Sequence, residues 1–183
     1  MTQLMLIFRL GSERYALATS SIIEIIPRVA LSRVHDAKKA ATVSSAVSSD
    51  SSPMAGRFNY HGQVVPVLDL SQILRGTPSR PALGTRIILV ALSKDPSAPD
   101  LNAPDLNAQH LMGFLVEQVT ETLEGSEFSP AVEDHDVSRP SYLSKTLMYQ
   151  QSIIQCVCLD QLVRTLTEDG VLDSPLPVAV TAG

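Results

Sequence analysis

The N-terminal part of the chain carries the alternating pattern of a β-strand. Every second residue from 4 to 10 is large and apolar, so these side chains share one face of an extended segment. Residues 11–14, GSER, have the composition of a tight turn, and the apolar pattern resumes at residues 15–17. The pattern predicts a β-hairpin at the start of the chain.

Three later segments predict more deeply buried strands. Residues 86–92, RIILVAL, are apolar at odd and even positions alike, which is typical of a central strand covered on both faces. Residues 111–116, LMGFLV, predict its partner, and residues 153–159, IIQCVCL, predict a further strand. Asp160 is suited to cap a final helix over about residues 160–167, which has apolar residues along one side.

The stretch GRFNYHGQVVPVLDL, which begins at Gly56, combines turn and strand signals. Its second half alternates as a strand, but it contains Pro66, and a proline within a strand favours an edge position or a bulge. Asp69 or Ser71 is suited to cap a short helix over residues 72–74.

A charged residue interrupts the apolar segment IIEII at residues 22–26, which its β-branched residues predict to be a strand. On a regular strand Glu24 shares a face with Ile22 and Ile26. Two interpretations stay open: Glu24 lies at a sheet edge, or it is a charged contact within an apolar binding surface.

Three segments lack a usable period. Residues 37–55 are rich in Ala and Ser, and residues 93–110 contain the tandem duplication APDLN-APDLN, so both predict long loops. Residues 168–183 contain Gly and Pro and predict a flexible tail. Many short strands with turn signals and little helix favour small barrels over a doubly wound sheet.

Composition narrows the function classes. The chain has 183 residues, 44% of them hydrophobic, no Trp, a net charge of −5 and a pI near 5.3. This acidic balance argues against a nucleic-acid surface, which needs a clustered basic face. We find no secretory signal, and the longest strictly apolar run, Ile87–Leu92, is too short to span a membrane. We expect a cytoplasmic protein without direct membrane insertion.

No pattern of catalytic or ligating residues emerges. The chain contains no HExxH, CxxC, Gly-x-Ser-x-Gly, Walker or dinucleotide motif. His35, His110 and His135 are interpreted as exposed residues, and Cys156 and Cys158 as reduced core cysteines. A hydrolase that uses His61 or Cys156 would need a partner residue that no motif supplies. We therefore expect a protein that is not an enzyme and has no cofactor or metal.

Five blocks taken together resemble one family. They are LIFRLGSERYALATSSIIEII, GRFNYHGQVVPVLDL, RIILVAL, MGFLVEQVTETLE and SIIQCVCLDQLV. In this order they are similar to the CheW-like domain of chemotaxis coupling proteins. The resemblance implies one mostly β domain over residues 4–166, built of two five-stranded SH3-like β-barrels that share a core, with a short C-terminal helix. Barrel one would span about 15–80, and barrel two about 4–14 plus 85–155.

The resemblance also implies a function. Members of this family are non-catalytic scaffolds that couple chemoreceptors to a histidine autokinase in bacterial chemosensory arrays. The expected partners are the helical tip of a methyl-accepting chemoreceptor and the regulatory domain of a CheA-type kinase. The expected location is the cytoplasm, with recruitment to membrane receptor arrays. The positions that match family residues for receptor binding are Ile22, Glu24, Gly56, Asn59, His61 and Gly62, and Gly113 matches a position for kinase binding.

His61 departs from the family pattern, which usually has Arg before the second glycine of this block. Arg is always charged and binds carboxylates with two parallel hydrogen bonds, whereas His is mostly neutral at pH 7. The Tyr60-His61-Gly62 variant resembles members of a Wsp-like surface-sensing branch. An alternative function is an SH3-like module that binds peptides or a regulatory ligand outside a receptor array.

Overall fold

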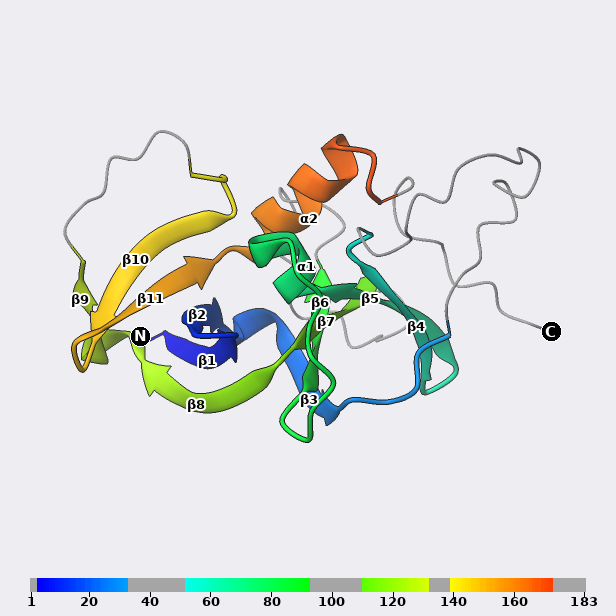
Figure 1. Cartoon of the computed structure of the whole chain (residues 1–183), viewed down its shortest axis with the longest axis horizontal. Helices are drawn as coiled ribbons and strands as arrows, with labels where there is room; N and C mark the ends of the chain where they lie inside the picture. Colours follow the sequence, from blue (N-terminus) through cyan, green and yellow to red (C-terminus); the bar gives the residue numbers. More distant parts are fainter. Residues whose placement is uncertain (1–2, 33–51, 93–109, 132–138, 173–183) are drawn as a thin grey trace.

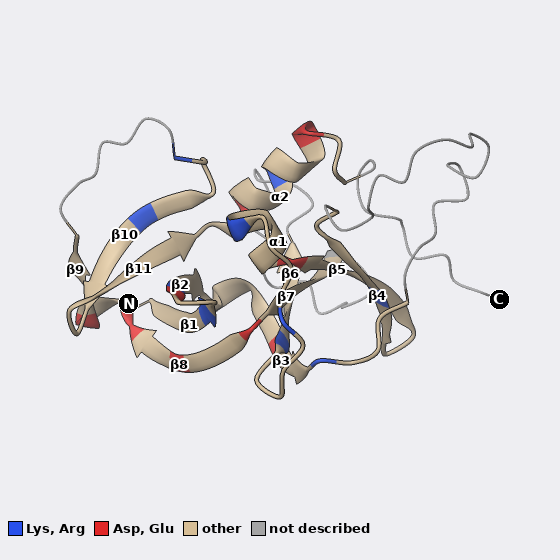
Figure 2. Ribbon diagram, viewed as in Figure 1, with Lys and Arg blue, Asp and Glu red and all other residues tan. Residues whose placement is uncertain are grey.

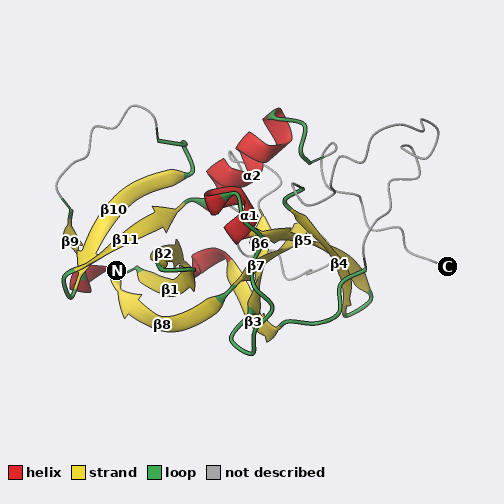
Figure 3. Ribbon diagram, in the orientation of Figure 1, coloured by secondary structure: helices red, strands yellow, loops and turns green. Residues whose placement is uncertain are grey.

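The computed structural model describes residues 3–32, 52–92, 110–131 and 139–172 (Figure 1). In these ranges the chain is mostly β, with two sheets and a C-terminal helix (Figure 3). The predicted loops at 37–55 and 93–110 fall largely outside the described residues, as do His35 and His135. Among the helices of the described chain, none has the length and apolar character to cross a bilayer.

The first sheet has six strands in the order β8-β1-β2-β11-β10-β9. Its strands are β1 (Leu4–Leu10), β2 (Glu13–Ala18), β8 (Gln118–Glu124), β9 (Ser129–Pro130), β10 (Leu143–Tyr149) and β11 (Ser152–Val157). The predicted N-terminal hairpin is confirmed, because β1 and β2 pair antiparallel across the turn at residues 11–12. The edge strands β8 and β9 are consecutive in the chain, separated by the 3-10 helix η4 (Gly125–Glu127).

The second sheet has five strands in the order β3-β6-β7-β5-β4. Its strands are β3 (Ile22–Pro27), β4 (Met54–Tyr60), β5 (Gln63–Asp69), β6 (Arg86–Leu92) and β7 (His110–Val116). The short 3-10 helix η1 (Thr19–Ser21) carries the chain from β2 in the first sheet to β3 in the second. As predicted, β6 is a central strand, with residues 87–90 buried.

Two backbone hydrogen bonds bring the ends of the five-stranded sheet together. Beyond β3, Ser32 pairs with Arg57 of β4, and each N–H donates to the other residue's carbonyl, at 2.8 and 2.9 Å. The sheet thereby closes on itself as a barrel, which satisfies the backbone groups of an edge that would otherwise be open.

Strand alternation divides the core into three clusters. On β1, Met5 and Ile7 face the interior of the six-stranded barrel, while the residues between and after them face the other way. On β6, Ile87 and Leu89 likewise face the interior of the five-stranded barrel. The outward-facing residues of both barrels form the largest cluster, together with the C-terminal helix. The two SH3-like barrels therefore share a core, as the fold class predicted.

The barrel boundaries expected from the sequence are wrong in two places. A boundary between residues 14 and 15 falls within β2 and separates most of it from β1, yet the tight turn between these strands requires them to pair in one sheet. β6 and β7, expected in barrel two, pair with β3 and β5 of the five-stranded sheet. Because both strands are apolar on both faces, they fit where a strand faces a barrel interior on one side and the shared core on the other.

The proline within β5 is accommodated by local geometry. Since β5 lies between β7 and β4, the expectation of an edge strand is wrong, and the register shift in the β4–β5 pair lies at Met54/Gly56 rather than at Pro66. Parallel pairing with β7 begins only at Val67. Pro66 lies just before the residues of β5 that pair with β7. The lack of an N–H group on the proline therefore removes no hydrogen bond to β7.

Both helices begin close to where the sequence predicts. Asp69 caps α1 (Leu70–Arg75), its Oδ1 accepting hydrogen bonds from the backbone N–H groups of Ser71 at 2.9 Å and Gln72 at 3.2 Å. The C-terminal helix α2 (Leu159–Glu168) packs Leu162 into the shared core. The predicted start of the flexible tail at residue 168 is wrong, because Leu172 is also buried in the shared core.

Gly113 occupies a position where the barrel interior leaves no room for a side chain. A Cβ there would lie 2.8 Å from Ile87 Cγ2 and 3.1 Å from Val67 Cγ2, both on neighbouring strands. We predict that Gly113→Ala lowers the free energy of unfolding by about 1–3 kcal/mol through overpacking. Gly84→Ala is the control, since its Cβ would meet no atom closer than 3.4 Å. Urea unfolding measures both, and equal midpoints for the two variants would contradict the packing.

Candidate functional site

The stretch NYHG forms the turn between β4 and β5. Tyr60 pairs with Gln63, which leaves His61 and Gly62 as a two-residue turn with φ of 49° and 88°. Positive φ at both central residues is the signature of a type I′ hairpin, which matches the twist of the flanking strands. Asn59 Oδ1 accepts a hydrogen bond of 2.8 Å from the Gly62 N–H across the turn. Asn59 and Gly62 therefore shape the hairpin that presents His61.

The side chain of His61 is exposed at the tip of this hairpin. Its ring lies edge-on to the ring of Tyr60, with the centroids 4.4 Å apart. Within the described residues the imidazole has no side-chain hydrogen-bond partner and no ion pair. Its nitrogens are thus available to a partner molecule.

Tyr60 connects the hairpin to Glu24 on β3. The Tyr60 hydroxyl donates a hydrogen bond of 2.7 Å to Glu24 Oε2. β3 and β4 are the two edge strands of the five-stranded sheet, so this contact exists only because the sheet closes on itself. The hydrogen bond to the carboxylate raises the pKa of Tyr60. We call the exposed group of Glu24, Tyr60 and His61 the hairpin cluster.

A bulge in β3 separates Glu24 from Ile22. The register shifts between these residues: Ile22 lies opposite Val90, but Glu24 lies opposite Leu89. The extra residue moves Ile22 to the other face of the strand, so the expectation that it shares a face with Glu24 is wrong. Of the two interpretations of Glu24, the structure confirms a position on an edge strand.

Ile22 lies at the junction of the two barrels. It is half-buried and packs against the shared core. Just before it, η1 contacts both β1 and β6, and the Thr19 hydroxyl donates a hydrogen bond of 3.2 Å to the Leu4 carbonyl. Leu4 is 46% exposed and Ile25 is 37% exposed. We use the name junction strip for three partly exposed apolar residues of β1 and β3: Leu4, Ile22 and Ile25.

Two glycines expected to contact partners are buried. Gly56 has a φ of 147°, and a Cβ there would lie 2.8 Å from Leu31 Cβ, beside the pairing that closes the barrel. Gly113 lies within the barrel interior on the five-stranded sheet. The kinase contact expected at Gly113 stays a prediction, and in the free protein this buried glycine has no side chain on the surface. Gly56 influences the surface only through the backbone conformation that it permits.

The structure thus places the sequence-predicted residues in three settings. Glu24 and His61 meet through Tyr60 in the hairpin cluster, with Asn59 and Gly62 shaping the turn, whereas Ile22 lies on the junction strip and Gly56 is buried. Sequence reasoning missed Tyr60 and Leu4 as surface residues. The contact between Tyr60 and Glu24 has no local signal, because it joins residues 36 positions apart.

The described residues allow two kinds of reactive group to be examined, a cysteine nucleophile and a metal site. Cys156 is buried in the six-stranded barrel, and burial raises the pKa of its thiol, which disfavours the nucleophilic thiolate. Across the described ranges, no group of three or more His, Cys, Asp or Glu side chains is placed to hold a metal ion. Lys and Arg positions are spread over several elements of the described chain rather than gathered on one sheet (Figure 2).

Comparison with known proteins gives two positive findings. A protein-family model described as the CheW-like domain matches residues 4–167. Among solved structures, the crystal structure of the scaffolding protein TtCheW from Thermoanaerobacter tengcongensis is similar, with a TM-score of 0.59 and 17% sequence identity. The similarity covers 87% of this chain and 86% of that one, and it concerns the fold. No curated protein sequence matches the chain.

The hydrogen bond between Tyr60 and Glu24 leads to a prediction about the pKa of the Tyr60 phenol. Because a carboxylate acceptor favours the protonated phenol, we expect Glu24→Gln to lower the pKa of Tyr60 towards the ordinary tyrosine value. The raised folded-state pKa means that this contact stabilises the fold below about pH 10 and that its contribution is lost as the pH rises further. Site-specific ¹³C NMR of the tyrosine ring measures the shift. Glu127→Gln is the control, and an unchanged Tyr60 pKa in Glu24→Gln would contradict the contact.

Proposed function

The chain belongs to the CheW-like domain family, and we propose that it is a non-catalytic scaffold that couples chemoreceptors to a histidine autokinase. The family match over residues 4–167 carries this proposal, because it spans both barrels and the C-terminal helix. The exposed surface of the described chain supports it, since large apolar side chains such as Ile25 and Ile153 are exposed and can contact a partner protein.

We propose the edge of β3 as the surface that receives the helical tip of a chemoreceptor. An amphipathic helix needs an apolar surface with a few polar groups to fix its orientation. The junction strip supplies the apolar side chains, and the hairpin cluster supplies a carboxylate and an imidazole. Glu24 and Ile25 are adjacent on the edge strand and point to opposite faces of it, so a helix along the edge of β3 would contact the hairpin cluster on one side and the junction strip on the other.

His61 is the proposed specificity residue of this surface. It replaces the arginine that is usual in the family, and it stands exposed at the hairpin tip beside Tyr60. A neutral imidazole makes one directed hydrogen bond, whereas a guanidinium pairs with carboxylates. We infer that the cognate receptor presents a different group here from the carboxylate that an arginine would select.

The second partner in this proposal is the regulatory domain of a CheA-type kinase. With Gly113 buried, the contact also needs an exposed apolar patch on the surface. Met148 and Ile153 form a cross-strand pair between β10 and β11, and they are 42% and 60% exposed. This pair suits a barrel-against-barrel contact. Binding to the receptor would recruit the protein from the cytoplasm to the membrane array.

Ile25→Asp tests the receptor surface. We expect roughly tenfold weaker binding to a cytoplasmic fragment of the cognate chemoreceptor, because a carboxylate would be desolvated against the apolar face of the helix. Isothermal titration calorimetry measures the affinity. The matched control is Val171→Asp, which places the same charge at a site with 41% exposure after α2. Equal affinity for the two variants would contradict the proposed surface.

The same assay examines His61. We expect His61→Arg to weaken binding of the cognate receptor fragment, while the thermal unfolding midpoint stays within a few degrees of the wild type. Equal affinity for wild type and His61→Arg would show that His61 does not select the receptor.

A further inference from the structure

A recess at the junction of the barrels lies apart from the residues assigned to the receptor. Its cavity volume is about 630 Å³. The turn at Gly11 and Ser12 forms one wall, and the segment after α1 forms the opposite wall. Neither the hairpin cluster nor the junction strip contributes a lining residue. The two barrels build this recess together.

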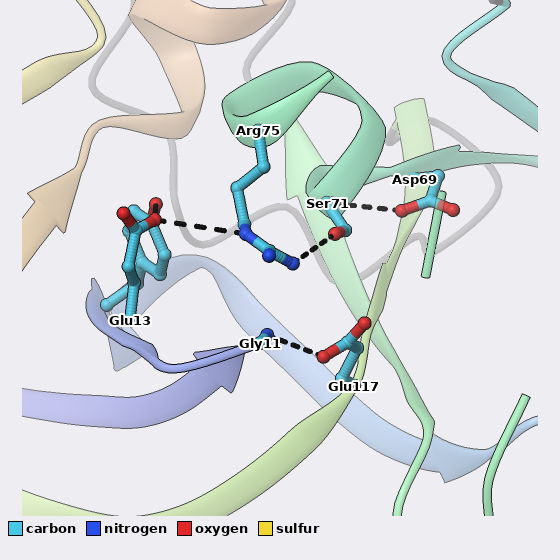
Figure 4. Close-up of polar contacts among 7 residues, drawn as sticks. Gly11, Glu13, Asp69, Ser71, Arg75 and Glu117 are labelled. Carbon is cyan, nitrogen blue, oxygen red and sulfur yellow. Dashed lines mark hydrogen bonds and ion pairs between the residues drawn. The ribbon is translucent and has the colours of Figure 1, made fainter. Parts of the chain in front are cut away.

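The recess is positively charged, although the chain as a whole is acidic. Three arginines, Arg9, Arg75 and Arg80, line it together with one carboxylate, Glu117. Arg75 is partly compensated, because its Nη1 donates to Ser71 Oγ at 3.2 Å and its Nε lies 4.0 Å from Glu13 Oε2 (Figure 4). Among the described residues, Arg9 and Arg80 have no ion pair, and Arg9 lies where this recess meets the mouth of the six-stranded barrel, since it lines both.

A neighbouring hollow provides a useful contrast. The mouth of the six-stranded barrel, with a volume of about 570 Å³, also contains arginine. There Arg14 is engaged by Glu121 at 2.7 Å and lies over the ring of Tyr149. In that hollow two carboxylates, Glu13 and Glu121, balance Arg9 and Arg14, whereas the recess between the barrels has three arginines and one carboxylate in its lining.

Glu117 shows which kind of group fits the recess. Its Oε2 accepts a hydrogen bond from the Gly11 N–H, and its Oε1 accepts one of 3.2 Å from the Arg80 N–H. One carboxylate thus links the two walls, and Figure 4 shows it below the guanidinium of Arg75. With these two N–H groups occupied, the charged donors that line the recess are the arginine side chains, beside the hydroxyl groups of Ser12 and Thr77.

The lining suits an acidic group that carries no nucleobase. No aromatic side chain is among the lining residues, so the recess lacks a surface on which a nucleobase would stack. Arginine binds carboxylates in a planar, bidentate geometry, which suits two side chains at the rim of a recess.

We propose that this recess binds an acidic segment of a partner protein, with Arg9 and Arg80 pairing with glutamate or aspartate side chains. The inference goes beyond the proposed receptor and kinase coupling and does not depend on it. Positive charge on both walls attracts the segment, and its carboxylates replace the missing counter-charges. Because both walls contribute, such a segment would contact both barrels at once.

Titration of the full chain with a hexaglutamate peptide tests this site. In ¹⁵N-labelled protein we expect the largest chemical-shift changes at the amides of Gly11, Ser12, Thr77 and Arg80. The double variant Arg9→Gln/Arg80→Gln should weaken peptide binding at least fivefold. The matched control, Arg28→Gln/Arg164→Gln, removes the same charge from exposed sites elsewhere and should bind as the wild type does. Hexaglutamine should not bind.

Three outcomes would overturn the proposal. Equal weakening in the two double variants would show attraction to overall charge only, and shifts confined to other residues would place the peptide elsewhere. Tighter binding of inorganic phosphate than of the peptide at the same amides would replace the carboxylate with a phosphate ligand. The receptor fragment serves as an independent readout: Arg9→Gln/Arg80→Gln should bind it normally, so a failed recess and a failed receptor surface are distinguishable.

Discussion

Closure of the five-stranded sheet is the constraint on which the candidate surface depends. The pairing of Ser32 with Arg57 joins the two edges of the sheet, and Gly56 lets the chain after β3 cross closely over β4. Without this closure, Glu24 and Tyr60 would lie on opposite edges of an open sheet. With it, they form a hydrogen bond beside the exposed His61. The backbone pairing of Ser32 with Arg57 therefore brings together the residues of the surface that we propose a partner recognises.

The shared core has a second consequence for function. Because β1 and β6 each face a barrel interior on one side and the common cluster on the other, neither barrel buries its apolar surface alone. The relative position of the barrels is then fixed by packing, and residues from both of them meet at the junction. Both the junction strip and the arginine-lined recess use this property, since each draws residues from both barrels. A scaffold requires such rigidity if it is to hold two partners in a defined relation.

Much of the fold follows from local pattern, whereas the site depends on contacts that pattern does not contain. The apolar residues of β6, the hairpin at β1 and β2, and the cap at Asp69 were predictable from periodicity and turn chemistry. The sheet to which each strand belongs was not, because it depends on pairing across long sequence separations. The bulge in β3 places Ile22 on the face opposite to the one expected from alternation. Side chains of a strand alternate between two faces, so one extra residue moves every residue before it to the other face. Gly113 matches a family position, yet only the packing around it shows that it is buried.

The most direct test of the central claim is whether the chain physically joins receptor and kinase. A cytoplasmic chemoreceptor fragment on vesicles would be sedimented with a CheA-type kinase, with and without this protein, and the kinase in the pellet would be measured. Coupling predicts that the kinase pellets with the receptor only when the protein is present, and that Ile25→Asp reduces this retention. Retention of the kinase to the same extent without the protein, or of the protein without the kinase, would contradict a coupling scaffold.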